Sequence, residues 1–216
     1  MIVAKFIISG VIGYTLGSIP FGFLVVKKMT GIDVREKGSR KLGTTNVLRV
    51  AGKKAAAIVF GLDLLKGSLA VIIAGLIFGR EYLVVGDFAW GMLVAQVIAA
   101  VSAMLGHSWS MFLKFRGGGR GVATFFGGLA ALFPPAALIG GEIFIIGAGL
   151  TRFVSLASII AAVSTYLVFV PLTIINKFPL EYLIYALIGT IVILIMHRGN
   201  IQRLLAGTER KLGDKA

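Results

Sequence analysis

Residues 121–150 read GVATFFGGLAALFPPAALIGGEIFIIGAGL, and this stretch decides how often the chain crosses a membrane. A membrane-spanning helix needs about 20 predominantly apolar residues, so the stretch is long enough for one span. Pro134 and Pro135 lie in its middle, however, and proline breaks a helix interior because it lacks a backbone N–H. The stretch is therefore either one kinked span or two short helices that cross twice or enter the membrane and return.

The rest of the chain has the composition of a membrane protein. Of its 216 residues, 57% are hydrophobic and 14% are charged, and the mean hydropathy is +0.95. Apolar runs at 3–26, 55–79, 87–113, 153–175 and 179–196 are further candidate spans. These segments leave no length for a soluble domain, so we expect a single integral membrane domain over residues 1–216.

Positive charge distinguishes the two topologies. Segments 27–54, 114–120 and 198–215 carry nine, three and five Lys or Arg residues, respectively. All three lie on one side of the membrane only if residues 121–150 cross twice or re-enter, and the positive-inside rule favours that arrangement. We therefore expect an all-α polytopic membrane protein of about seven transmembrane helices, two of them short, with the N-terminus outside and the C-terminus inside.

Residue usage excludes several kinds of site. The chain has no cysteine and only two histidines, which excludes disulfides, a thiol nucleophile and a Cys- or His-rich metal cluster. We expect no metal and no cofactor. The net charge of +13 fits topogenic loops and attraction to membrane lipids, so we expect no nucleic-acid partner. This explanation accounts less well for arginines that lie among glycines, serines and asparagines.

The first basic segment offers groups that bind phosphate. It reads REKGSRKLGTTNVLRVAGKK from Arg35 to Lys54, and its candidate ligands are Ser39, Asn46 and Arg49. A helix that begins near Thr45 would place Asn46 and Arg49 on one face, with its positive end toward an anion. The alternative is a solvated loop.

The second basic segment, FRGGGRGVAT at 115–124, also offers groups that bind phosphate, and it places them within ten residues. Consecutive glycines let backbone N–H groups form a concave anion site, and a helix that starts at Gly121 would add its N-terminus. The candidates are Gly117, Gly118, Gly119, Arg120 and Gly121. A Walker A sequence is absent, and a flexible basic turn is the alternative.

Polar groups within and beside the spans are further candidates, because such groups are costly in a membrane. Asp63 and Lys66 are three residues apart and can pair as a structural salt bridge, while His107 lies at the inner end of its span. In the tail, His197, Asn200 and Arg203 recur every three residues on one helix face, although an interfacial anchor also explains the arginine. Ser155 and Ser158 are expected to serve helix packing.

Taken in order, these motifs resemble those of the bacterial acyl-phosphate:glycerol-3-phosphate acyltransferase family (PlsY type). The resemblance runs from about residue 10 to the tail. It rests on five stretches: GSIPFG at 17–22, GSRKLGTTNVLR at 38–49, GHSWSMFLKFRGGGRGVAT at 106–124, RFVSLAS at 152–158 and HRGNIQRLLAGTERK at 197–211.

The resemblance implies a seven-helix enzyme of the bacterial inner membrane whose active site faces the cytoplasm. It implies transfer of a fatty acyl group from acyl phosphate to the 1-hydroxyl of glycerol 3-phosphate, which gives lysophosphatidic acid and phosphate in the first step of phospholipid synthesis. By position it implicates Ser39, Asn46 and Arg49, the glycine-rich loop 117–121, and His197, Asn200 and Glu209.

From the motifs and the resemblance together we assign roles. The catalytic candidates are His197, Ser39 and Asn200; the candidates for binding substrate phosphate are Asn46, Arg49, Gly117, Gly118, Gly119, Arg120, Gly121, Lys66, His107 and Arg203; and the structural supports are Glu209, which would hold the tail through an arginine, and Asp63. Acyl phosphate is already activated, so we expect direct attack by the glycerol hydroxyl. The base is either His197 or an oxygen of the substrate phosphate.

The chain departs from the family pattern at the presumed anion site. Arg40 and Lys41 replace a glycine and an asparagine, Thr44 replaces an alanine, and the loop 117–121 has an extra glycine and arginine in place of lysine. Arginine and lysine hold phosphate with different geometry. The alternative function is accordingly a non-catalytic relative of the same fold that transports phosphate esters or lipids, or senses acyl phosphate.

Overall fold

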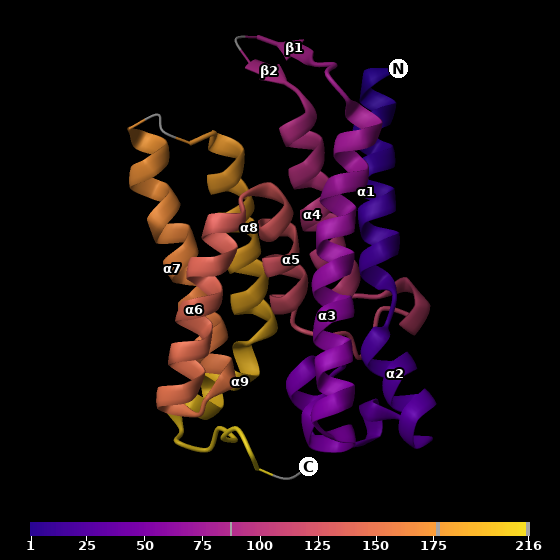
Figure 1. The fold of residues 1–216 in the computed structure, drawn as a ribbon, viewed down its shortest axis with the longest axis vertical. Coiled ribbons are helices and arrows are strands. Elements are labelled where there is room, and N and C mark those ends of the chain that lie inside the picture. Colours follow the sequence, from indigo (N-terminus) through magenta and orange to yellow (C-terminus); the bar gives the residue numbers. More distant parts are fainter. Residues whose placement is uncertain (87, 176–177, 215–216) are drawn as a thin grey trace.

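The computed structural model describes residues 1–86, 88–175 and 178–214, and these are mostly helical (Figure 1). The helices are α1 (Ile2–Ser18), α2 (Phe21–Thr30), α3 (Thr44–Phe78), α4 (Met92–Ser108), α5 (Val122–Leu132), α6 (Pro134–Thr151), α7 (Val154–Ile174), α8 (Leu180–Met196) and α9 (Arg198–Leu205). Two short strands, β1 (Leu83–Val85) and β2 (Phe88–Trp90), precede α4, and single 3-10 turns lie at Val34–Glu36 and Met111–Leu113.

Length and apolarity identify the membrane-spanning helices. In the part of the chain that the structure describes, five segments are long and apolar enough to cross: Ile2–Thr30, Thr44–Phe78, Met92–Leu113, Pro134–Thr151 and Val154–Ile174. α8 and α9, bent by 62° at His197, add a sixth if the two are counted as one broken span. α5 is apolar but has only 11 residues, which at about 1.5 Å per residue is short of a bilayer core of about 30 Å. The expected helical membrane fold is confirmed.

The stretch 121–150 forms two helices and not one kinked span. Phe133 is extended, with φ −152° and ψ 88°, because a residue before proline avoids the helical region, and Pro134 begins α6. α6 runs back beside α5 (Figure 1). The turn between them lies nearer the middle of the molecule than the C-terminal end of α7 does.

Two boundaries differ from the expectations. The first apolar run, expected as one span over 3–26, breaks at Ile19, since Pro20 follows and holds Ile19 at a ψ of 116°. The run expected over 87–113 becomes helical only at Met92, because β1 and β2 pair in an antiparallel hairpin with Leu83 opposite Trp90. β-branched and aromatic residues favour this hairpin over helix, so a short hairpin accompanies the otherwise helical fold.

Two apolar clusters hold the site in place. The larger joins α4, α5, α7 and α8 around Met104, Phe125 and Tyr185, where the Tyr185 hydroxyl donates to the carbonyl of Phe125 at 2.8 Å. The smaller packs Val34 and Leu42, which lie in the loop after α2, against the first half of α3. The loop 31–43 is therefore anchored by buried side chains.

The two chain ends lie at opposite ends of the bundle (Figure 1). The β-hairpin lies at the end that holds the N-terminus, while the loop after α2, the start of α3 and the helix α9 lie toward the end that holds the C-terminus. The segments that carry the predicted motifs thus gather at one end of the molecule.

Candidate functional site

A cavity of about 510 Å³ lies where these segments meet. Residues of the loop after α2, the glycine-rich loop before α5, the start of α7, the helix α9 and the tail all contribute to its wall. Sequence segments more than 150 positions apart therefore form one site, as the motifs predicted.

A second cavity of about 150 Å³ adjoins the first. Its wall includes the apolar side chains of Phe60, Val122 and Phe144. The two cavities share Ser39, Lys41, Thr45, Arg120, Val154 and Ser155. A polar chamber and a more apolar one thus meet at a junction that carries two cations.

The large cavity is strongly positive. Among the described residues, its wall holds one carboxylate, that of Glu209, and six basic side chains: Lys41, Arg49, Arg120, Arg198, Arg203 and Arg210. Burial, together with the nearby charges of Arg203 and Arg49, lowers the pKa of Arg120 to about 10. Burial and the charges of Arg120 and Arg198 likewise lower the pKa of Lys41. Cations that repel one another in this way are stabilised by a bound anion.

Several donors at this cavity have no partner within the protein. Among the described residues, the Nε atoms of Arg49 and Arg120 and the hydroxyl of Ser108 are buried without a hydrogen bond. Buried polar groups are nearly always satisfied in folded proteins. Donors left open beside a positive cavity therefore point to a ligand that accepts hydrogen bonds.

Helix N-termini reinforce the positive field. α3, α7 and α9 begin at the large cavity, where Thr45, Ser155 and Asn200 line its wall, and α5 begins at the small cavity with Val122. Each N-terminus carries unsatisfied N–H groups and about half a positive charge. The arrangement suits an anion such as phosphate.

Asn46 holds the loop that carries Ser39. Its Oδ1 accepts from the backbone N–H of Ser39 at 2.8 Å, and its Nδ2 lies within hydrogen-bond distance of the carbonyls of Val34, Lys37 and Lys41. Both carboxamide atoms are thus occupied. Asn46 thus positions Ser39, which lines both cavities. Asn46 itself lines the small cavity, and its predicted contact with phosphate stays a prediction.

The glycine-rich loop contributes fewer groups than predicted. Gly117 and Arg120 line the large cavity and Gly121 the small one. Gly118 and Gly119 are buried against the end of α4, and the N–H of Gly119 donates to the carbonyl of His107 at 3.1 Å. The amide of Gly119 is therefore not available to a ligand.

His197 and Asn200 flank the junction of α8 and α9. The Nδ1 of His197 lies 2.8 Å from the carbonyl of Ile193 and must donate to it, which leaves Nε2 as the proton acceptor of a neutral ring. His197 lines the small cavity and Asn200 the large one.

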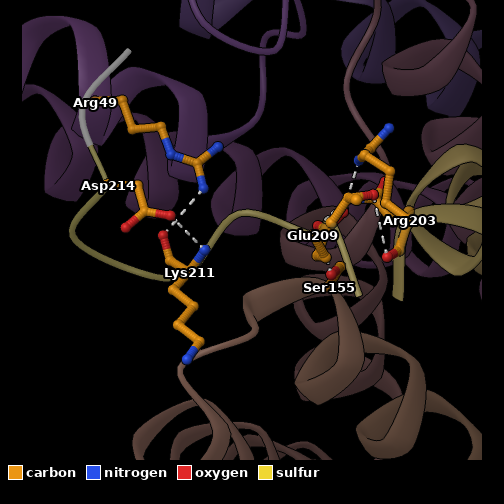
Figure 2. A network of polar contacts seen from close by, with 8 residues as sticks. Arg49, Ser155, Arg203, Glu209, Lys211 and Asp214 are labelled. Carbon is orange, nitrogen blue, oxygen red and sulfur yellow. Dashed lines mark hydrogen bonds and ion pairs between the residues drawn. The ribbon is translucent and has the colours of Figure 1, made fainter. Parts of the chain in front are cut away.

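Glu209 ties the tail to the wall of the cavity (Figure 2). Its carboxylate accepts from Ser155 Oγ at 2.8 Å, Asn200 Nδ2 at 2.6 Å and Arg203 Nε at 2.7 Å. Burial alone would raise the pKa of Glu209, but these hydrogen bonds outweigh it and hold the pKa below its usual value. Ser155, expected to serve packing, is thus part of the polar site.

The tail beyond Glu209 crosses to two other elements (Figure 2). The guanidinium of Arg49 contacts the carbonyl of Lys211 at 3.4 Å, and the N–H of Lys211 donates to Asp214 at 2.7 Å. Arg152 and Leu212 exchange hydrogen bonds, at 2.9 Å from the guanidinium and 2.7 Å from the backbone N–H of Leu212. The role of Arg152 was not predicted, because its partner lies 60 residues away.

Lys66 lies apart from the two cavities. Its ammonium is 2.8 Å from Asp63 and donates to the carbonyl of Ile19 at 3.1 Å, and the side chain is 3% exposed. The predicted phosphate contact of Lys66 therefore has no support in this geometry, whereas the predicted pair with Asp63 is present. Asp63 and His107 reach the wall of the small cavity.

The remaining residues complete the picture. Arg198 and Arg210 line the large cavity but were not singled out by the sequence motifs, while Arg40 is exposed and lines neither cavity. Within the described residues, no group of three or more His, Cys, Asp or Glu side chains is arranged to hold a metal ion.

Comparison with known proteins gives a consistent result. A family model described as glycerol-3-phosphate acyltransferase matches residues 7–207. Glycerol-3-phosphate acyltransferase 3 of Dehalococcoides mccartyi (strain CBDB1) is 56% identical over 216 residues, which is 100% of both chains. Glycerol-3-phosphate acyltransferase of Trichormus variabilis is 41% identical over 211 residues, covering 95% of this chain and 91% of the relative.

Solved structures agree with these relatives. A crystal structure of PlsY (YgiH), an integral membrane glycerol 3-phosphate acyltransferase, in its glycerol 3-phosphate form superposes with a TM-score of 0.82 at 35% identity, covering 96% of each chain. The lysophosphatidic acid form of PlsY gives a TM-score of 0.80 at 34% identity, covering 96% of this chain and 95% of PlsY.

Proposed function

This chain belongs to the glycerol-3-phosphate acyltransferase family, and from this premise we propose that it transfers an acyl group from acyl phosphate to the 1-hydroxyl of glycerol 3-phosphate. The products are lysophosphatidic acid and inorganic phosphate. The observation that carries the proposal is a cavity lined by six cations, two of which have buried Nε atoms with no partner among the described residues. Both substrates carry phosphate, so the reaction needs this excess of cations.

The shape of the site supports a division of labour. The polar chamber suits glycerol 3-phosphate, because its wall is rich in arginine. The smaller chamber, with Phe60, Val122 and Phe144 in its wall, suits the first part of an acyl chain. Ser39, Lys41 and Arg120 lie at the junction, where the acyl carbonyl and its phosphate would meet the acceptor hydroxyl.

The reaction is a direct acyl transfer. The 1-hydroxyl oxygen attacks the acyl carbonyl carbon, the new ester C–O bond forms, and the bond from that carbon to the phosphate oxygen breaks. The proton of the hydroxyl passes either to Nε2 of His197 or to an oxygen of the departing phosphate. Arg120 and Lys41 stabilise the charge that develops on the phosphate.

We further propose a bacterial inner-membrane location with seven spans, the N-terminus outside and the site facing the cytoplasm. Support comes from the basic segments 27–54, 114–120 and 198–215, since Lys and Arg are enriched in cytoplasmic loops. The two chain ends lie at opposite ends of the bundle, which is consistent with an odd number of crossings such as seven (Figure 1).

The test is release of inorganic phosphate by the purified protein given palmitoyl phosphate, with and without glycerol 3-phosphate. We expect release that depends on the acceptor. Arg120→Ala should lower kcat/KM by about a hundredfold, because a charged hydrogen bond to phosphate is worth about 1.5–3 kcal/mol and the charge also serves the transition state. Arg116→Ala is the matched control, since Arg116 is exposed in the same loop and lines neither cavity.

An opposite result would change the function. If the wild-type protein binds glycerol 3-phosphate but releases no phosphate from palmitoyl phosphate, the acyltransferase proposal fails. The non-catalytic alternative, a transporter or an acyl-phosphate sensor, then takes its place and is tested by uptake of phosphate esters into vesicles.

A further inference from the structure

A cluster of titratable side chains is buried beneath the glycine-rich loop and takes no part in the reaction described above. Asp63 lies between Lys66 and His107, with its Oδ1 2.8 Å from the Lys66 ammonium and 3.4 Å from Nδ1 of His107. All three side chains are at most 6% exposed. Burying charges is costly unless they are paired, so this cluster calls for a purpose beyond stability.

The cluster connects parts of the molecule that are distant in sequence. Lys66 donates to the carbonyl of Ile19, at the break between α1 and α2 where Pro20 interrupts the helix. Asp63 and Lys66 belong to α3, and His107 belongs to the last turn of α4. The His107 ring is thereby tied to α3 through Asp63 and, through Lys66, to the break between α1 and α2.

The His107 ring is the surface on which Gly119 rests. A Cβ atom added to Gly119 would lie 2.0 Å from Nε2 of His107 and 2.6 Å from Cε1, far closer than van der Waals contact. The N–H of Gly119 also donates to the carbonyl of His107. The next residue in the chain is Arg120, whose side chain lines both cavities.

We propose that His107 is a positioning residue that acts through Gly119, and that the buried Asp63–Lys66 pair sets the orientation of its ring. The imidazole fixes the height of the glycine-rich loop above α4, and the loop in turn places the guanidinium of Arg120 at the junction of the cavities. On this proposal the imidazole acts on the loop and not on the substrate. The proposal rests on the proposed function, because its main readout is acyl transfer.

A compensation experiment tests it. Gly119→Ala should raise the KM for glycerol 3-phosphate about tenfold, since forcing a methyl group into a filled site displaces the loop. His107→Ala removes the ring that the new methyl group meets. The double variant His107→Ala with Gly119→Ala should therefore recover most of the loss, with a KM within about threefold of His107→Ala alone.

Gly118→Ala is the matched control. A Cβ atom at Gly118 would lie 2.2 Å from the carbonyl oxygen of Ser108, which is backbone and stays in place when the His107 ring is removed. Gly118→Ala should impair the enzyme, and His107→Ala should not rescue it. Rescue restricted to Gly119→Ala would assign the effect to the contact between the ring and the loop.

The outcomes separate this inference from the proposed function. If wild-type protein catalyses transfer but His107→Ala gives no recovery in Gly119→Ala, or recovers Gly118→Ala equally, the positioning role is refuted and the activity stands. If wild-type protein shows no transfer, the proposed function fails first. Thermal unfolding midpoints of every variant exclude a loss of folding, and His107→Ser serves as a second variant should His107→Ala not fold.

Discussion

A single buried carboxamide organises the loop that carries Ser39. Asn46 is 2% exposed, and its side chain reaches four backbone groups of residues 34–41. An alanine at position 46 would leave these backbone N–H and carbonyl groups without a hydrogen-bond partner in the protein interior. Ser39, which lines both cavities, would lose the contact that fixes its backbone.

We therefore predict that Asn46→Ala lowers the free energy of unfolding by about 2 kcal/mol, because unsatisfied buried groups cost about 1–3 kcal/mol. The kcat/KM for acyl transfer should fall along with the thermal unfolding midpoint. Gln202→Ala, which truncates an exposed amide in α9, is the control and should change neither. A variant with wild-type stability but no activity would instead indicate that Asn46 binds substrate directly.

The residues whose chemistry is local were predicted best. His197, Asn200 and Arg203 were placed on one face by their spacing of three, and Asn200 and Arg203 do converge on the same carboxylate. Ser155 was misjudged because its partner, Glu209, lies 54 residues away. The hydrogen bonds of the Asn46 carboxamide to the backbone were also not predicted, because only the folded loop brings their partner groups together.

The tail is the element most dependent on a few polar contacts. Glu209 joins it to α7 and α9, and Arg49 holds the backbone further along (Figure 2). Arg152 holds the backbone at Leu212. The pKa of Glu209 is lower in the folded protein than in the unfolded chain. The ionised carboxylate therefore stabilises the folded state at every pH above the ordinary carboxyl pKa. That stability is lost as the pH falls through the lowered value.

We predict that Glu209→Ala releases the tail. Trypsin should then cleave after Arg210 and Lys211 several times faster than in the wild-type protein, because local opening exposes the chain. Acyl transfer should fall as well, since Asn200 and Arg203 lose their common partner. Glu36→Ala, which removes an exposed carboxylate, is the control. Equal cleavage rates in Glu209→Ala and wild type would show that the carboxylate does not hold the tail.

The helix break at Pro134 and Pro135 was easier to predict from the sequence than the break before Pro20. Pro134 and Pro135 interrupt an apolar run in its middle, and the structure turns the chain there. Pro20 lies near the end of a run that is long enough without it, so the break at Ile19 was overlooked. The β-hairpin was missed because its short apolar strands merge with the span that follows.

At the scale of the whole molecule, the same positive charges serve two purposes. Lys41, Arg120 and Arg198 belong to the basic segments that predicted the topology, and all three line the large cavity. A chain inserted with these segments on one side of the membrane brings its anion-binding groups to one aqueous face. The location of the site thus follows from the insertion of the helices.

Sidedness is tested with single cysteines, because the chain has none of its own. Arg116, Lys211 and Tyr82 are exposed, the first two near the cavity end and the third beside the β-hairpin. We predict that Arg116→Cys and Lys211→Cys react with a membrane-impermeant thiol reagent only in inside-out vesicles, and Tyr82→Cys only in right-side-out vesicles. A permeant reagent, which should label all three in both preparations, is the control. Reaction of Arg116→Cys and Lys211→Cys from opposite sides would require an odd number of crossings between them, and the basic segments could not then share one face with the site.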